Sequence, residues 1–162
     1  MKTKIVLLIT FLGLALVPAM PAAEKEKEKE KKHDHDHAKR EAGPNGGRVI
    51  HSVEPHYEFF VTEDRKVKIT FLGEDKKAIA AAAQTVSAIG GKRSKPTKMV
   101  FASDGGSLVS DQPLPEGNMV PIVLTVKVSP DAKAVTEKFN IDFSDCPTCD
   151  FKEYACTCDH EH

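Results

Sequence analysis

The sequence lacks cysteine over its first 145 residues, and it lacks an excess of charge of either sign. Its 162 residues include 23 basic and 24 acidic side chains, which give a formal net charge of −1. The sequence shows neither a basic run nor a set of aromatic residues for base stacking, and these are the marks of a nucleic-acid-binding protein. We therefore expect no nucleic-acid partner.

Enzyme motifs are also missing. The chain has no His-Glu-x-x-His motif, and the segment from Asp104 to Ser107 lacks the strand–turn–helix context of a nucleophile elbow. The segment Gly43-Pro-Asn-Gly-Gly47 is not a phosphate-binding loop, because no Gly-Lys-Ser/Thr accompanies it. These absences predict a protein that is not an enzyme.

Only one long apolar run occurs, and it lies near the start of the chain. The apolar stretch Ile5–Val17 follows two lysines and precedes small residues up to Ala23, which predicts a signal peptide over residues 1–23. Cleavage is expected after Ala19 or after Ala23. Since no second such run follows, we expect a periplasmic or secreted protein that does not span a membrane after cleavage.

Residues 24–42 are almost wholly charged. Glutamate and lysine alternate first, and then His33, His35 and His37 alternate with aspartate. Because the segment has no apolar face to bury, we predict that it is disordered. Histidine-rich tracts bind Zn(II), Ni(II) or Cu(II) weakly, so we interpret the three histidines as metal ligands. The alternative is a solvated linker that binds nothing.

Residues 43–144 carry short runs of alternating apolar and polar residues. The clearest run places Val120, Ile122 and Leu124 on one face of a strand. The expected strands span residues 48–53, 57–62, 66–72, 85–89, 97–102, 107–110, 120–128 and 139–143. Roughly eight strands with frequent turns predict an all-β fold, a single antiparallel β-sandwich of the Ig-like or a related Greek-key type. The alanine-rich run over residues 77–84 allows at most one or two helical turns.

All the cysteines lie in the C-terminal segment, residues 145–162, in a C-x2-C-x6-C-x-C pattern that two histidines follow. Thiolates and imidazoles bind soft and borderline metals. We predict that the thiolates bind Zn(II) or Cu(I), and that the histidines here and in the N-terminal segment form a weaker capture shell for Zn(II) or Cu(II). The predicted C-terminal ligands are Cys146, Cys149, Cys156, Cys158, His160 and His162.

Two other readings of the cysteines stay open. In an oxidising compartment they could form disulfides, for example Cys146–Cys158 with Cys149–Cys156 closing a hairpin. A redox dithiol at Cys146 and Cys149 would need a helix N-terminus in a thioredoxin-like context, and the sequence predicts none. A domain of this length can bury a sufficient core without cross-links, so disulfides are not obligatory.

A second candidate site lies at the first predicted turn between strands. His51 and His56 flank this turn, and Glu54 and Glu58 are close by in the sequence. Imidazoles and carboxylates together could form a shallow metal site. The alternative is that these are solvent-facing side chains at strand ends.

The segment Gly43–Val49, which runs into Glu54–Phe60, resembles a segment of small exported bacterial proteins. It is also similar to a His-Gly-Pro-x-Gly-Gly element near the periplasmic portions of adaptor subunits of heavy-metal efflux pumps. The resemblance implies a periplasmic, β-rich domain associated with metal handling. Ala42 stands where the adaptor element has its histidine, and the coiled-coil hairpin and lipoyl-like parts of an adaptor are missing. Only a turn at Gly43–Gly47 is therefore carried over.

Together these patterns predict an exported, non-enzymatic metal-binding protein. It would act as a buffer, a carrier or an accessory of heavy-metal handling, and its expected partner besides the metal ion is an efflux or envelope protein. The alternative is a disulfide-stabilised binding or structural module of the cell envelope that holds no metal.

Overall fold

The computed structural model describes residues 41–158, and over this range it confirms the predicted all-β class. The strands are β1 (Arg48–Ile50), β2 (Tyr57–Val61), β3 (Val67–Leu72), β4 (Ala78–Ile79), β5 (Thr85–Gly90), β6 (Thr97–Asp104), β7 (Ser107–Ser110), β8 (Met119–Lys127) and β9 (Val135–Asp142). A short 3-10 helix, η1 (Glu153–Ala155), follows them. Within residues 41–158, no helix has the length and apolar character needed to cross a membrane.

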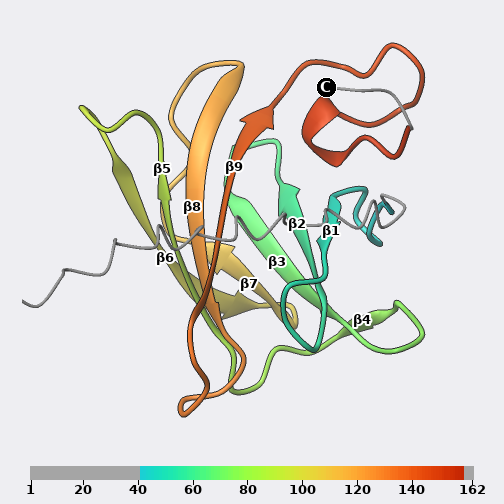
Figure 1. Ribbon diagram of the computed structural model, residues 1–162, viewed down its shortest axis with the longest axis vertical. Helices are drawn as coiled ribbons and strands as arrows, with labels where there is room; N and C mark the ends of the chain where they lie inside the picture. The colour runs from blue at the N-terminus through green and yellow to red at the C-terminus, as the bar shows by residue number, and fades with distance from the viewer. Residues whose placement is uncertain (1–40, 159–162) are drawn as a thin grey trace, which may run out of the picture. The chain divides into compact units, whose positions relative to one another are not determined.

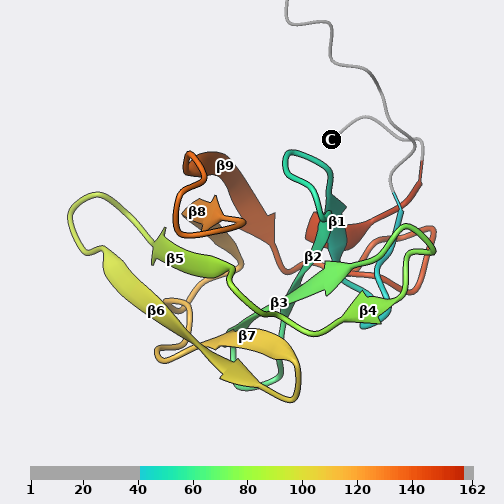
Figure 2. The same cartoon turned by 90° about the horizontal axis from the view of Figure 1, so that it is seen from below.

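The strands form one antiparallel sheet that curls into a half-barrel. Its hydrogen-bonded order is β1-β2-β3-β7-β6-β5-β8-β9, and β4 pairs with β3 outside this path. Figure 1 shows the curl from the side, and Figure 2 shows the strands following an arc from β1 round to β9. The predicted sandwich of two separate sheets is not confirmed, because the hydrogen-bonded path is continuous.

Strand β6 makes the sheet continuous by changing its partner halfway along. Its first half, from Thr97 to Val100, pairs with β5, and its second half pairs with β7. At the change, the Val100 amide donates to the Asp111 carboxylate at 2.8 Å, and the Asp111 amide donates to the Val100 carbonyl at 2.8 Å. Because one strand serves both halves, they are joined by backbone hydrogen bonds.

Most of the predicted strands form at or near the expected positions. In β8, the alternating residues Val120, Ile122, Leu124 and Val126 are buried, as their period-2 pattern predicts. Strand β1 ends at Ile50, three residues before the expected end. The run over residues 77–84 forms no helix; its residues Ala78 and Ile79 pair with β3 as the exposed strand β4.

Aromatic side chains fill the interior of the curl and connect its two ends. Phe59 of β2 and Phe139 of β9 make an edge-to-face contact with ring centroids 5.1 Å apart. The Arg48 guanidinium lies over the Phe139 ring at 5.1 Å from its centroid. Such pairs add about 0.5–1.5 kcal/mol to the stabilisation that burial alone provides. The first and last strands of the sheet are therefore linked by side-chain packing.

Candidate metal centre

The cysteine-bearing segment continues directly from β9 as a small hairpin. Asp145 and Lys152 form an antiparallel bridge and also an ion pair. Inside it, the Cys146 amide donates to the Phe151 carbonyl at 3.0 Å, which closes the Cys146-Pro-Thr-Cys149 loop. The turn η1 follows the hairpin and returns the chain toward this loop, so that the second pair of cysteines meets the first.

Tyr154 anchors this segment to the sheet. Its side chain is buried, and its hydroxyl oxygen accepts a hydrogen bond from the Val61 amide at 3.1 Å. Its ring contacts Phe59 and Phe143 edge-on, each with centroids 6.0 Å apart. Burying an aromatic side chain of this size contributes about 1.5–3 kcal/mol. The segment, drawn in red in Figure 1, is therefore a docked part of the fold.

The structure gathers the sulfur atoms of all four cysteines within 4.8 Å of one another. The Sγ atom of Cys156 lies 3.4 Å from that of Cys146 and 3.8 Å from that of Cys149. Cys146 and Cys156 are buried, whereas Cys149 and Cys158 are half-buried. The cluster can therefore hold a metal ion.

These separations match tetrahedral thiolate ligation. A metal with bonds of about 2.3 Å to four sulfurs places the sulfurs about 3.8 Å apart. All four cysteines are thiols, and the separations given above are much longer than the bond of about 2.05 Å that a disulfide requires. The Cys146–Cys149 loop precedes no helix, since η1 begins only at Glu153. A redox dithiol therefore lacks the helix N-terminus that would activate it.

The thiols differ in acidity because their surroundings differ. The hydrogen bond with the Thr148 hydroxyl, together with the Thr148 backbone amide and the neighbouring thiols, lowers the pKa of Cys146 to about 6. Burial raises the pKa of Cys156 to about 12. The Phe151 amide lowers the pKa of Cys149, but burial and the adjacent thiols outweigh it, so that this pKa is raised. A metal would therefore replace protons on Cys149 and Cys156.

Sequence reasoning missed two residues of this centre. The Thr148 hydroxyl donates to Cys158 Sγ at 3.0 Å and also lies 3.3 Å from Cys146 Sγ, so it connects the two cysteine pairs. Tyr154 positions the turn that carries the second pair. Its signal was present in the sequence, since Phe151 and Tyr154 are the large apolar residues of an otherwise polar segment.

The structure brings together three of the four residues of the predicted histidine group. His51 and His56 contact each other edge-on with centroids 4.5 Å apart, and Glu54 lies 3.4 Å from the His56 ring. Glu58 does not join them, because its side chain is fully buried elsewhere. The predicted ligands His33, His35, His37, His160 and His162 lie outside the described residues, as do the signal peptide and the charged segment up to residue 40.

Glu58 instead holds the glycine-rich turn that carries the resemblance. Its carboxylate accepts hydrogen bonds from the amides of Asn45 and Gly47, at 2.8 and 2.7 Å, and from the Asn45 side chain at 2.6 Å. A Cβ atom at Gly43 would lie 2.4 Å from the Glu58 carboxyl carbon, and one at Gly47 would lie 2.3 Å from the Phe59 carbonyl oxygen. Both glycines are thus required by close packing.

Comparison of the chain with protein-family models, with curated proteins and with solved structures found no match.

Proposed function

We propose that this protein is an exported metal-binding protein that holds one Zn(II) or Cu(I) ion with four cysteine thiolates. The observation that carries the proposal is the convergence of the sulfurs of Cys146, Cys149, Cys156 and Cys158 within 4.8 Å. Four soft ligands at tetrahedral spacing favour these ions over hard cations such as Mg(II) or Ca(II). The site would serve as a buffer or carrier, because a metal with four protein ligands has no open position for a substrate.

The surroundings of the cluster also favour stable binding. Cys146 and Cys156 are buried, the Thr148 hydroxyl donates to Cys158 Sγ, and the Cys158 amide lies 3.3 Å from Cys156 Sγ. Hydrogen bonds to thiolate sulfur stabilise the charged form that binds the metal. The docked position of the segment reduces the ordering that metal binding would otherwise require.

A metal titration of the reduced chain tests the proposal. Zn(II) and Cu(I) are each added in competition with a chelator of known affinity, to the unmodified chain and to a Cys149→Ser variant. We expect one tight equivalent in the unmodified chain and a much weaker one in the variant. A Thr157→Ser variant is the matched control, since Thr157 lies between two cysteines and its hydroxyl is retained. Equal affinity in all three chains would overturn the proposal.

The rival function is a cell-envelope module locked by disulfides. The approach of Cys156 Sγ to two other sulfurs favours it, because small movements would allow a bond. Alkylation of unreduced protein from its own compartment, followed by mass spectrometry, counts the thiols. Two disulfides and no metal would establish the rival. Export itself, and a partner in metal efflux, are parts of the proposal that rest on the N-terminal apolar run and the resemblance.

A further inference from the structure

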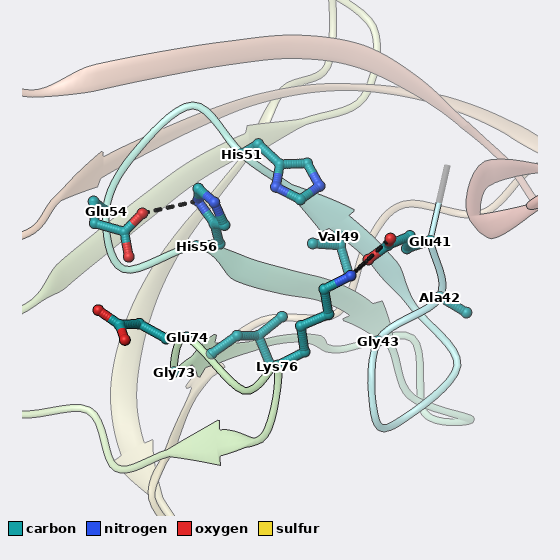
Figure 3. A pocket seen from close by; sticks show the side chains of 11 residues that line it. Glu41, Ala42, Gly43, Val49, His51, Glu54, His56, Gly73, Glu74 and Lys76 are labelled. Carbon is teal, nitrogen blue, oxygen red and sulfur yellow. Dashed lines mark hydrogen bonds and ion pairs between the residues drawn. The ribbon is translucent and has the colours of Figure 1, made fainter. Parts of the chain in front are cut away.

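The histidine pair beside the β1–β2 hairpin is fixed by the strand register. Ile50 of β1 pairs with Tyr57 of β2, and His51 and His56 are the next residues outward on the two strands. Paired positions on antiparallel strands place their side chains on the same side. Their ring centroids lie 4.5 Å apart with an interplanar angle of 78°, and Figure 3 shows the two side chains next to each other. The fold therefore places two imidazoles together.

The hydrogen bonds of His56 set which ring nitrogen is available. Its Nδ1 atom lies 2.9 Å from the Val53 carbonyl oxygen and 3.4 Å from a carboxylate oxygen of Glu54. A carbonyl oxygen can only accept, so Nδ1 carries the proton and donates it. In the neutral ring, Nε2 is then left with its lone pair. Histidines that bind metals in proteins are oriented in this way by a carbonyl or a carboxylate.

A cavity of about 410 Å³ lies against the pair, and its charge favours a cation. Its lining includes His51, His56 and the carboxylates of Glu41, Glu54 and Glu74. Among residues 41–158, the one lining ammonium group belongs to Lys76, and it contacts both oxygens of the Glu41 carboxylate at 2.8 and 2.6 Å. The described part of the lining thus carries three acidic groups against one basic group (Figure 3).

We propose that His51 and His56 form a second metal site, for an exchangeable divalent cation of the borderline class such as Zn(II). The two imidazole nitrogens are the protein ligands, Glu54 orients His56, and water completes the coordination. Two protein ligands at the edge of a cavity bind more weakly than four thiolates. The His56 side chain is 40% exposed, which allows the cation to enter and leave. The site is independent of the cysteine cluster.

The test uses the full chain with the five remaining histidines replaced by alanine, so that His51 and His56 are its only imidazoles. These five are His33, His35, His37, His160 and His162. One equivalent of Zn(II) first saturates the cysteines, and a second is added while nitrogen-15 NMR follows the imidazole resonances. We expect the second equivalent to move the resonances of both rings. His51→Ala or His56→Ala should abolish its binding, and Glu54→Gln should weaken it about tenfold.

Glu63→Gln serves as the matched control, because Glu63 is an exposed turn residue outside the cavity lining. Amide spectra of each variant show whether the fold is kept, and the exposed position of His51 and the half-buried position of His56 favour this. Two results would overturn the inference: imidazole resonances that do not respond to the second equivalent, or equal binding in the unmodified pair and the alanine variants. Failure of the first equivalent would instead count against the cysteine proposal.

Discussion

The two candidate ligand groups of this protein, the cysteine cluster and the histidine pair, differ in how the chain assembles them. The cysteine cluster draws all its ligands from the short segment Cys146–Cys158, folded as a hairpin and one turn. The histidine cavity draws its lining from residues 41 to 76, and its paired imidazoles depend on the register of two strands. One group is local and partly buried, whereas the other is assembled by the sheet and lies at its surface.

Because of this difference, we expect the two groups to differ in their affinity for a metal ion and in how fast they release it. Four thiolates, two of them buried, favour a tight site that releases its ion slowly, whereas two imidazoles with one carboxylate behind them favour a weak site. A protein that carries both can retain one ion and sample others.

Replacing Cys156 by serine should have the largest effect. Its sulfur lies close to two other sulfurs, so the change removes a central ligand of the cluster. We expect affinity for Zn(II) to fall by about two orders of magnitude or more, since structural zinc sites bind with a total of about 10–16 kcal/mol. Chelator competition measures the loss. The histidine resonances should respond to Zn(II) as before, and a loss at both groups would contradict their independence.

Replacing Tyr154 by alanine should weaken the docking of the cysteine-bearing segment on the sheet without removing a metal ligand. The change removes a buried ring and leaves the Val61 amide without its acceptor, at a cost of about 3–5 kcal/mol. Hydrogen exchange at Val61 and urea unfolding measure this loss. Tyr154→Phe keeps the ring, so it should cost only about 1–3 kcal/mol. Unchanged exchange at Val61 in the alanine variant would show that the segment does not depend on Tyr154.

The affinity of the cysteine cluster for a metal ion should depend steeply on pH. The pKa of Cys156 is raised to about 12 and that of Cys149 is also raised, so both thiols are protonated near neutral pH. Metal binding displaces at least these two protons, so affinity should rise at least about hundredfold per pH unit between about pH 6 and pH 8. Below the Cys146 pKa of about 6, a further proton on Cys146 steepens the fall.

Chelator competition at several pH values, with calorimetry in buffers of different ionisation enthalpy, counts the protons released. An affinity that stays constant over this window would mean that the thiols are already ionised without metal, which contradicts the raised pKa values. The Cys149→Ser variant should release fewer protons, and this serves as the internal control.

The sequence predicted the cysteine cluster because its ligands are close together along the chain. Any compact turn over so short a segment brings the sulfurs near one another. Its anchor was not predictable, since Tyr154 meets Val61 across 93 residues. The same holds for the continuous sheet, which depends on the choice of two partners by β6. Pairings between distant segments leave no periodic signal in the strands themselves.

Glu58 shows how a sequence pattern can mislead about a site. It lies two residues after His56, and residues two apart on a strand point to the same face, so the sequence suggested a shared site. In the structure Tyr57, Glu58 and Phe59 are all buried, because the glycine-rich turn covers the second face of β2. The covering turn is itself held by the Glu58 carboxylate. Neither the sequence of the turn nor that of β2 predicts this contact by itself.

Glu58→Gln should therefore weaken the fold and leave the cysteine cluster unaffected. The amide that replaces one carboxylate oxygen would point a donor at the donors of Asn45 or Gly47. We expect a loss of about 1–3 kcal/mol in the free energy of unfolding, measured with urea. Glu63→Gln, at an exposed turn, should cost nothing measurable. A neutral effect of Glu58→Gln would mean that the turn does not rely on the buried charge.

The smallest expected effect is that of Lys76→Met on the histidine cavity. Lys76 is the one lysine or arginine among the described residues that line the cavity, and its ammonium group contacts Glu41. Removing it leaves the lining more negative, and because the group is 68% exposed, solvent screens most of the gain. Affinity of the second Zn(II) equivalent should rise only about twofold to fivefold. A fall would mean that Lys76 orders Glu41 for binding, while the cysteine cluster should stay unchanged because its ligands lie in a different segment.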